Sequence, residues 1–227
     1  MNAVVPVCTV ISLLAGCAVS QLSTLKKDES DKNYAAIENK SIDSSCTGSG
    51  QGSPECAQMS EIQGRACLTL AQQEAAPNAA CPPATDTARR RLQCAATDLD
   101  ASRLGQQFSS DQLIELGEMH ARALYCGATL KARSDGLPDA REAARELESP
   151  SLPPSPRREQ LAAAAELYVA NSDGLQDAER CRAALRAIAR ADRGLTESPD
   201  DSMKQGLQAT RDHASSVAAH LTACPTS

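Results

Sequence analysis

Cysteine is the residue type in this chain whose number and spacing could do the most chemistry. Two of the ten cysteines, Cys8 and Cys17, fall in an apolar N-terminal stretch. The other eight are Cys46, Cys56, Cys67, Cys81, Cys94, Cys126, Cys181 and Cys224. No two of these eight have the CxxC spacing that zinc knuckles use, so no metal site is expected. An even number of cysteines is typical of disulfide bonding in an oxidising compartment, and eight cysteines predict four disulfides.

Helical hairpins would restrict how these cysteines pair. A turn near residue 80 places Cys67 opposite Cys94, and a turn near residue 107 brings Cys126 toward the loop that carries Cys81. Cys56 and Cys67 cannot bond within one straight helix, because eleven residues rise about 16 Å and a disulfide needs Cα atoms within about 7 Å. Two further pairs then remain by elimination. The expected disulfides are Cys67–Cys94, Cys81–Cys126, Cys46–Cys56 and Cys181–Cys224.

The apolar N-terminal stretch ends at Cys17. Residues 3–16 carry no charge and are too few to span a bilayer, which takes about 20 helical residues. They suit the core of a signal peptide. The sequence at their end, Leu14-Ala15-Gly16-Cys17, resembles the lipobox of bacterial lipoproteins. The alternatives are an ordinary cleaved signal peptide and a buried helix with two incidental cysteines.

The lipobox resemblance implies a lipid anchor. Residues 1–16 would be removed as a signal peptide, and Cys17 would be lipidated with acyl chains such as palmitate. Ala18 follows the lipidated cysteine, where Asp is the usual signal for retention in the inner membrane. The resemblance therefore implies a protein of the bacterial outer membrane more than of the inner membrane, with its remaining chain in the periplasm.

A stripe of arginines is the clearest candidate for binding a partner. Its members recur at helical spacing and are Arg182, Arg186, Arg190 and Arg193. Arg89, Arg90 and Arg91 form a second basic group. Guanidinium groups suit carboxylates and phosphates, so either group could dock an acidic protein. The alternative interpretation is a solvated face whose charges are absorbed by Asp177, Glu179 and Asp192.

The chain has few residues arranged for catalysis. His120, His213 and His220 are its histidines. The last two are about 10 Å apart along a helix, too far to share one metal, and no acid lies one turn from His120 to support its ring. Nucleophile elbows and phosphate-binding loops are absent from the sequence. We therefore expect no enzyme activity, no cofactor and no metal.

Composition favours an all-α fold and excludes some functions. The 227 residues carry a net charge of −6 and only 2% aromatic residues, which argues against nucleic-acid binding. Forty alanines and few β-branched apolar residues argue against a sheet. From residue 55 the apolar periodicity is helical throughout. We expect about seven helices packed as antiparallel hairpins and stapled by disulfides.

Punctuating residues locate these helices. They are expected over 55–76, 86–104, from the Ser109 capping box to Gly136-Leu137-Pro138, from Asp139 to just before Pro150, from Pro156 onward, from Asp173–Gln176 to Gly194, and from Ser198–Asp201 onward. Ala88, Leu92, Ala95 and Leu99 should face the core in the second helix. Ala178, Cys181, Leu185 and Ile188 should do so in the sixth.

These observations divide the chain into segments. The expected divisions are a signal peptide (1–16), a lipidated N-terminus with a flexible polar tether (17–53), a first helical subdomain (54–149), a Pro-rich connector (150–156) and a second helical subdomain (157–227). The window from Leu161 to Leu185 faintly resembles a tetratricopeptide helical hairpin. The expected function is a periplasm-facing lipoprotein that binds a protein of the cell envelope as an adaptor or accessory subunit. The alternatives are an inhibitor of a cell-wall or membrane hydrolase, and an envelope enzyme or small-ligand carrier.

Overall fold

A computed structural model describes residues 8–42, 46, 53–76, 79–105, 108–148 and 155–224. Within these ranges every regular element is an α-helix, which confirms the expected all-α class. The helices are α1 (Cys8–Ser30), α2 (Tyr34–Glu38), α3 (Pro54–Gln73), α4 (Asp86–Ser102), α5 (Ser110–Thr129), α6 (Arg133–Glu146), α7 (Pro156–Ala170), α8 (Asp177–Thr196) and α9 (Asp201–His220).

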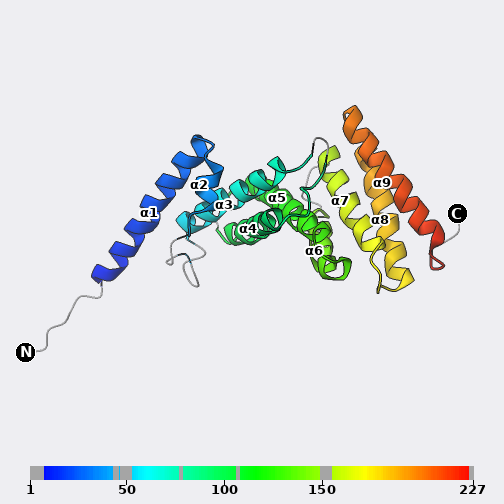
Figure 1. Ribbon diagram of the computed structural model, residues 1–227, viewed down its shortest axis with the longest axis horizontal. Coiled ribbons are helices and arrows are strands. Elements are labelled where there is room, and N and C mark those ends of the chain that lie inside the picture. Colours follow the sequence, from blue (N-terminus) through cyan, green and yellow to red (C-terminus); the bar gives the residue numbers. More distant parts are fainter. Residues whose placement is uncertain are drawn as a thin grey trace, which may run out of the picture.

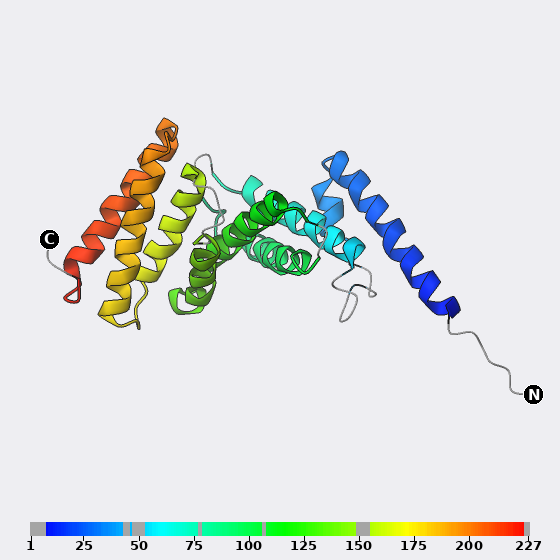
Figure 2. The same cartoon turned by 180° about the vertical axis from the view of Figure 1, so that it is seen from behind.

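The helices follow one another along the long axis of the molecule, from α1 at one end to α8 and α9 at the other (Figure 1). The view from behind shows the same order (Figure 2). From α3 onward each helix packs on the next one in the chain, and α7 also packs on α9. Buried apolar side chains consequently gather in several clusters along the molecule instead of in one central core.

Side chains cap three helices at or beside the starts that the sequence indicated. The Ser109 hydroxyl accepts a hydrogen bond from the Gln112 backbone amide, and the Gln112 side chain accepts one from the Ser109 amide. Ser155 caps α7 directly before Pro156, and Asp200 caps α9. Each cap satisfies an amide that the helix itself leaves without a partner. These short patterns therefore define where α5, α7 and α9 begin.

The prediction of a flexible tether over residues 17–53 is wrong for the first half of that segment. Residues 18–30 belong to α1, residues 34–38 form α2, and both helices pack on α3. Residues 43–45 and 47–52 of the expected tether lie outside the described residues. No helix in the described part of the chain is long and apolar enough to cross a membrane.

Apolar side chains dock this N-terminal segment. Leu22, Leu25 and Ile37 are buried against Met59 and Ile62 of α3. The charges that suggested a tether, such as those of Lys26 and Lys27, remain exposed. The segment is thus an amphipathic helix whose few apolar residues share one face.

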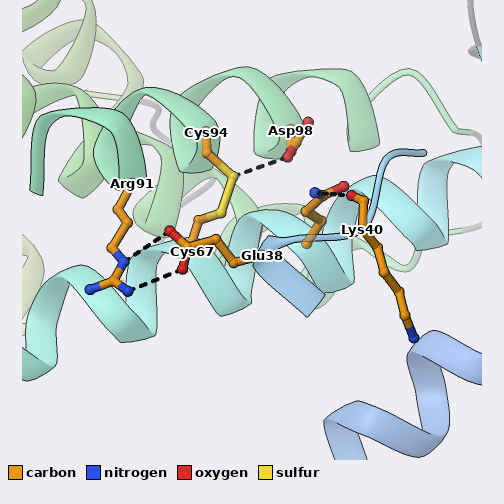
Figure 3. Close-up of a disulfide and its surroundings, with 7 residues drawn as sticks. Glu38, Lys40, Cys67, Arg91, Cys94 and Asp98 are labelled. Carbon is orange, nitrogen blue, oxygen red and sulfur yellow. Dashed lines mark hydrogen bonds and ion pairs between the residues drawn. A yellow bond between two sulfur atoms is a disulfide. The ribbon is translucent and has the colours of Figure 1, made fainter. Parts of the chain in front are cut away.

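Hydrogen bonds and ion pairs fasten α2 to the rest of the protein. Arg91 of α4 binds both carboxylate oxygens of Glu38, at 2.9 and 3.0 Å. The Gln63 amide donates to the Lys40 carbonyl at 2.7 Å. Figure 3 shows that the Arg91–Glu38 pair lies beside the Cys67–Cys94 disulfide, which joins α3 to α4. The helix pair α3–α4 is therefore the platform on which the N-terminal segment docks.

Four disulfides cross-link the described residues. They are Cys46–Cys56, Cys67–Cys94, Cys81–Cys126 and Cys181–Cys224. These are the four pairs expected from hairpin geometry and elimination. Their Cα atoms are 5.2 to 6.1 Å apart, within the range that a disulfide requires. All four join helices, or the segments beside them, that are near one another in the sequence, and Cys181–Cys224 closes the start of α8 onto the end of α9.

The corner between α5 and α6 differs from the sequence expectation. The third expected helix was to continue to Gly136, but α5 ends at Thr129 and α6 already begins at Arg133, with Pro138 inside it. The Tyr168 hydroxyl of α7 lies 3.1 Å from the Ala128 carbonyl and 3.3 Å from the Arg133 carbonyl. It stabilises the corner by hydrogen bonding at the place where one helix ends and the next begins. Pro138 lies inside α6 and lacks the backbone N–H that would donate one helical hydrogen bond.

Alanine, more than leucine, forms the helix contacts in the C-terminal half. In α8 the buried positions include Ala184, Ala187 and Ala191, whereas Leu185, expected to face inward, is 43% exposed. Ala178 is also exposed, so the expected inward face of α8 is wrong at these two positions. Small side chains allow close approach of helices, and this outweighed the larger apolar area of Leu185 in setting the rotation of α8.

Glycine permits an equally close approach of α3 to α4. A Cβ on Gly64 would lie 2.8 Å from Leu99 Cγ and 3.0 Å from the Leu99 backbone nitrogen. Gly64→Ala is expected to lower the free energy of unfolding by about 1–3 kcal/mol. The measurement is urea denaturation of the oxidised protein.

Gly117→Ala is the matched control, because nothing lies within 4 Å of its Cβ position in α5. It should raise the free energy of unfolding by up to about 1 kcal/mol through helix propensity. Equal stabilisation by the two substitutions would show that α3 and α4 do not need a glycine at their contact.

Candidate functional site

The arginine stripe of α8 faces carboxylates of α7. Arg186 binds both oxygens of Glu166, at 2.6 and 3.0 Å. Arg190 and Arg193 both approach Glu159, at 3.4 Å. Arg182 is exposed and has no ion pair among the described residues. Three of the four arginines proposed for partner binding are thus neutralised within the protein.

The carboxylates that neutralise them are not the ones considered in the sequence. Glu159 and Glu166 are only 4% and 3% exposed, whereas Asp177, Glu179 and Asp192 form ion pairs with other arginines. A signal was available, because Glu159 and Glu166 are seven residues apart on an alanine-rich helix. Seven residues make about two helical turns. Arg186 and Arg193 on α8 have the same separation.

The second basic group is largely engaged as well. Arg89 donates to the Leu130 carbonyl and pairs with Asp86, while Arg91 holds Glu38. Arg90 is exposed, with no ion pair in the described part of the chain. Fastening helices together therefore accounts for most of these charges.

His120 has an acidic partner that sequence spacing did not indicate. Its Nδ1 lies 2.9 Å from both carboxylate oxygens of Glu146, which comes from α6, and Arg103 of α4 pairs with the same carboxylate. Burial favours the neutral form of Glu146, but the hydrogen bonds from His120 and Arg103 outweigh it and lower the pKa. The group joins α4, α5 and α6 and fixes the imidazole ring. Spacing within one helix does not indicate the His120–Glu146 pair, because Glu146 is 26 residues away in the sequence.

The other sequence candidates lie apart from one another. His213 and His220 are exposed on α9. Cys17 falls within α1, and its side chain lies outside the described part of the structure. Among the described residues no group of three or more His, Cys, Asp or Glu side chains is arranged to hold a metal ion.

A charged pocket between α3, α5 and α7, beside the end of α1, brings together residues that the sequence did not single out. Its volume is about 370 Å³. Leu68, Met119 and Leu161 supply an apolar part of its lining. The charged part consists of Arg65, Arg122, Arg157, Arg158, Glu29, Glu115 and Glu118. We call it the arginine pocket.

Two of the arginines in the arginine pocket have carboxylate partners. Arg65 pairs with Glu115 at 2.7 Å and with Glu61 at 2.9 Å. Arg158 donates from Nη2 to Glu118. The Arg158 side chain is nevertheless only 5% exposed, and its buried Nε and Nη1 have no hydrogen-bond partner among the described residues. The charge of Arg158 is therefore incompletely compensated, and burial lowers its pKa.

Arg122 and Arg157 have no ion pair among the residues that the structure describes. Burial, together with the nearby charge of Arg157, lowers the pKa of Arg122 to about 10. Arg122 is still cationic near neutral pH. The pocket lining thus has four arginines and three glutamates, in a chain whose net charge is −6.

Comparisons of the chain with known protein families, with curated proteins and with solved structures gave no match.

One carboxylate near the Cys67–Cys94 disulfide is also poorly compensated. The Asp98 Oδ2 atom lies 3.4 Å from the Cys94 sulfur (Figure 3). A disulfide sulfur has no proton to donate, so this contact does not stabilise the carboxylate. Burial raises the pKa of Asp98 to about 6.

The raised pKa of Asp98 predicts a pH-dependent contribution to stability. The folded carboxyl binds its proton more tightly than the unfolded one, so this contribution is complete below about pH 4 and is lost as the pH rises through about 6. At pH 8 Asp98→Asn should therefore raise the free energy of unfolding, by at most about 3 kcal/mol and by less because the residue is partly exposed.

The measurement is urea denaturation at several pH values between 4 and 8. The stability difference between the Asn variant and the native protein should shrink as the pH falls. Asp100→Asn, which removes an exposed carboxylate from the same helix, is the control. A difference that does not change with pH would contradict a raised pKa at Asp98.

Proposed function

We propose that this chain is a lipid-anchored protein of the bacterial cell envelope whose helical body is a protein-binding module in the periplasm. The observation that carries the proposal is the sequence Leu14-Ala15-Gly16-Cys17 ahead of a body with four disulfides. Disulfides persist in oxidising compartments such as the periplasm. Two or more acyl chains on Cys17 would make the anchoring stable.

The course of α1 suggests how such an anchor would hold the body. Ala18, the residue after the proposed lipidation site, is already buried, and so are Leu22 and Leu25 one and two turns later. The lipid would therefore be attached almost directly to the packed part of the protein. We infer that the body stays close to the membrane surface. Ala18 at this position favours the outer membrane, as the lipobox resemblance implies.

A binding role fits the cross-linked body. Disulfides and interhelical ion pairs hold its surfaces in one arrangement before a partner arrives, which reduces the entropy lost on binding. Leu104 and Leu113 are 58% and 41% exposed and flank the same turn between α4 and α5. Large apolar side chains left exposed near one another in the sequence are candidates for a protein contact site. We propose this turn as the place where a protein of the envelope binds.

The anchor is tested by Cys17→Ser. The substitution removes the thiol that would be lipidated, so processing as a lipoprotein should stop. Fractionation and mass spectrometry should find the native protein in the membrane fraction with an acylated N-terminal cysteine, and the Ser variant without acyl chains. Cys8→Ser is the control and should leave acylation unchanged. An unacylated Cys17 in the native protein would exclude the proposed anchor.

The binding role is tested by cross-linking in intact cells followed by affinity purification of the full chain. We expect one or a few envelope proteins in near-stoichiometric amount. The variant with both Leu104→Asn and Leu113→Asn should recover them at least about tenfold less, because apolar contact at the turn is lost. Leu185→Asn changes an exposed leucine on α8 and is the control. Equal recovery with both variants would rule out the α4–α5 turn, and a lack of any partner would rule out the binding role.

A further inference from the structure

An uncompensated positive charge remains beside Arg122 because two of the three carboxylates in the arginine pocket, those of Glu115 and Glu118, already bind other arginines. Glu118 lies one turn before Arg122 on α5, the spacing at which acidic and basic side chains normally pair. Its carboxylate instead binds Arg158 of α7. Glu115, which lies one turn before Glu118 on α5, binds Arg65 of α3. Arg122 therefore lines the pocket without an ion pair among the described residues.

The start of α7 adds to this positive charge. Arg157 and Arg158 lie in its first turn, where the helix dipole is positive and backbone amides favour a nearby anion. Arg158 is buried. Glu118 accepts a hydrogen bond from one of its three nitrogens, and Glu159 attracts its charge without a hydrogen bond to the other two. A buried cation that is only partly paired raises the free energy of the empty protein. An anion in the pocket would lower that free energy.

We propose that the arginine pocket binds the phosphate group of a small ligand, held between Arg122 and Arg157. Guanidinium groups match phosphate in shape and charge and can each donate two hydrogen bonds to it. The volume of about 370 Å³ admits a phosphate together with a small organic group. Leu68, Met119 and Leu161 would contact the carbon part of that ligand. The site is formed by the folded body and does not depend on lipidation of Cys17.

Glu29 affects how tightly the arginine pocket would bind an anion. It lines the same pocket from the end of α1 and has no ion pair among the residues described. Its negative charge opposes an anion and reduces the affinity. Removing this charge should therefore strengthen phosphate binding, an effect opposite in sign to the loss of an arginine.

Two sources could supply the same phosphate chemistry. One is a soluble phosphate or phosphate monoester, and the other is the phosphodiester headgroup of a membrane lipid. Isothermal titration calorimetry of the full oxidised chain in detergent, near neutral pH and at constant ionic strength, distinguishes them. The probes are inorganic phosphate and glycerophosphoglycerol, which is a lipid headgroup without its acyl chains.

Four single variants test whether binding occurs in the arginine pocket. Arg122→Gln and Arg157→Gln should each weaken binding by about tenfold or more, because each removes a charged donor to the phosphate. Glu29→Gln should tighten binding by a few-fold. Arg182→Gln removes an exposed arginine that does not line the pocket and has no ion pair among the described residues, so it should change nothing. Arg157 is exposed, so its variant is expected to fold, which circular dichroism and the thermal midpoint will verify.

Each result of the titration is informative. Binding of inorganic phosphate with this pattern of variants supports the proposal and identifies a soluble ligand. Binding of glycerophosphoglycerol alone, with the same pattern, supports it and identifies a lipid headgroup. Absence of binding of both probes overturns it. Binding that Arg157→Gln and Arg182→Gln weaken equally also overturns it, since the effect would then come from net charge.

Discussion

An alanine side chain buries too little apolar surface to hold two helices together firmly, and alanine makes most of the helix contacts in the C-terminal half of this protein. A fully buried leucine contributes about 2 kcal/mol, and an alanine contributes much less. In that half the Cys181–Cys224 disulfide compensates, at about 2–4 kcal/mol. The other three disulfides cross-link residues 46–126. Ion pairs with one buried partner, such as the pair of Arg186 with the buried Glu166, act differently. Breaking one leaves an uncompensated charge inside, so these pairs select the rotation and register of helices that alanine alone would leave poorly defined.

The parts of the fold that depend on nearby residues were predictable from the sequence. Ser109, Ser155 and Asp200 cap helices because the cap and the amide it satisfies lie within three residues of each other. Cys67–Cys94 and Cys81–Cys126 followed from hairpin geometry, because a turn fixes which positions of two neighbouring helices meet, and the other two pairs followed by elimination. The inward face of α4 was predicted from residues within one helix, since leucine and alanine recur there at helical spacing.

The candidate site was not predictable in this way. Whether an arginine is free depends on which carboxylate reaches it, and the partners here come from other helices: Glu166 for Arg186, Glu146 for His120, Glu118 for Arg158. The docking of α1 was missed for a related reason. Only a few apolar residues in a charged segment carry it, and their burial depends on an apolar surface of α3 that helical periodicity in residues 18–42 does not reveal.

The close connection between Cys17 and α1 has a mechanical consequence. In a chain anchored at Cys17, any pull between the membrane and a bound partner enters the protein through α1. Force applied at the end of a helix lying on a neighbour peels it away a turn at a time, so the contacts of Leu22, Leu25 and Ile37 would yield in sequence. The Cys46–Cys56 bond then passes the load directly to the first turn of α3. The segment from α1 to residue 46 would extend under tension, while the cross-linked body behind it keeps its shape.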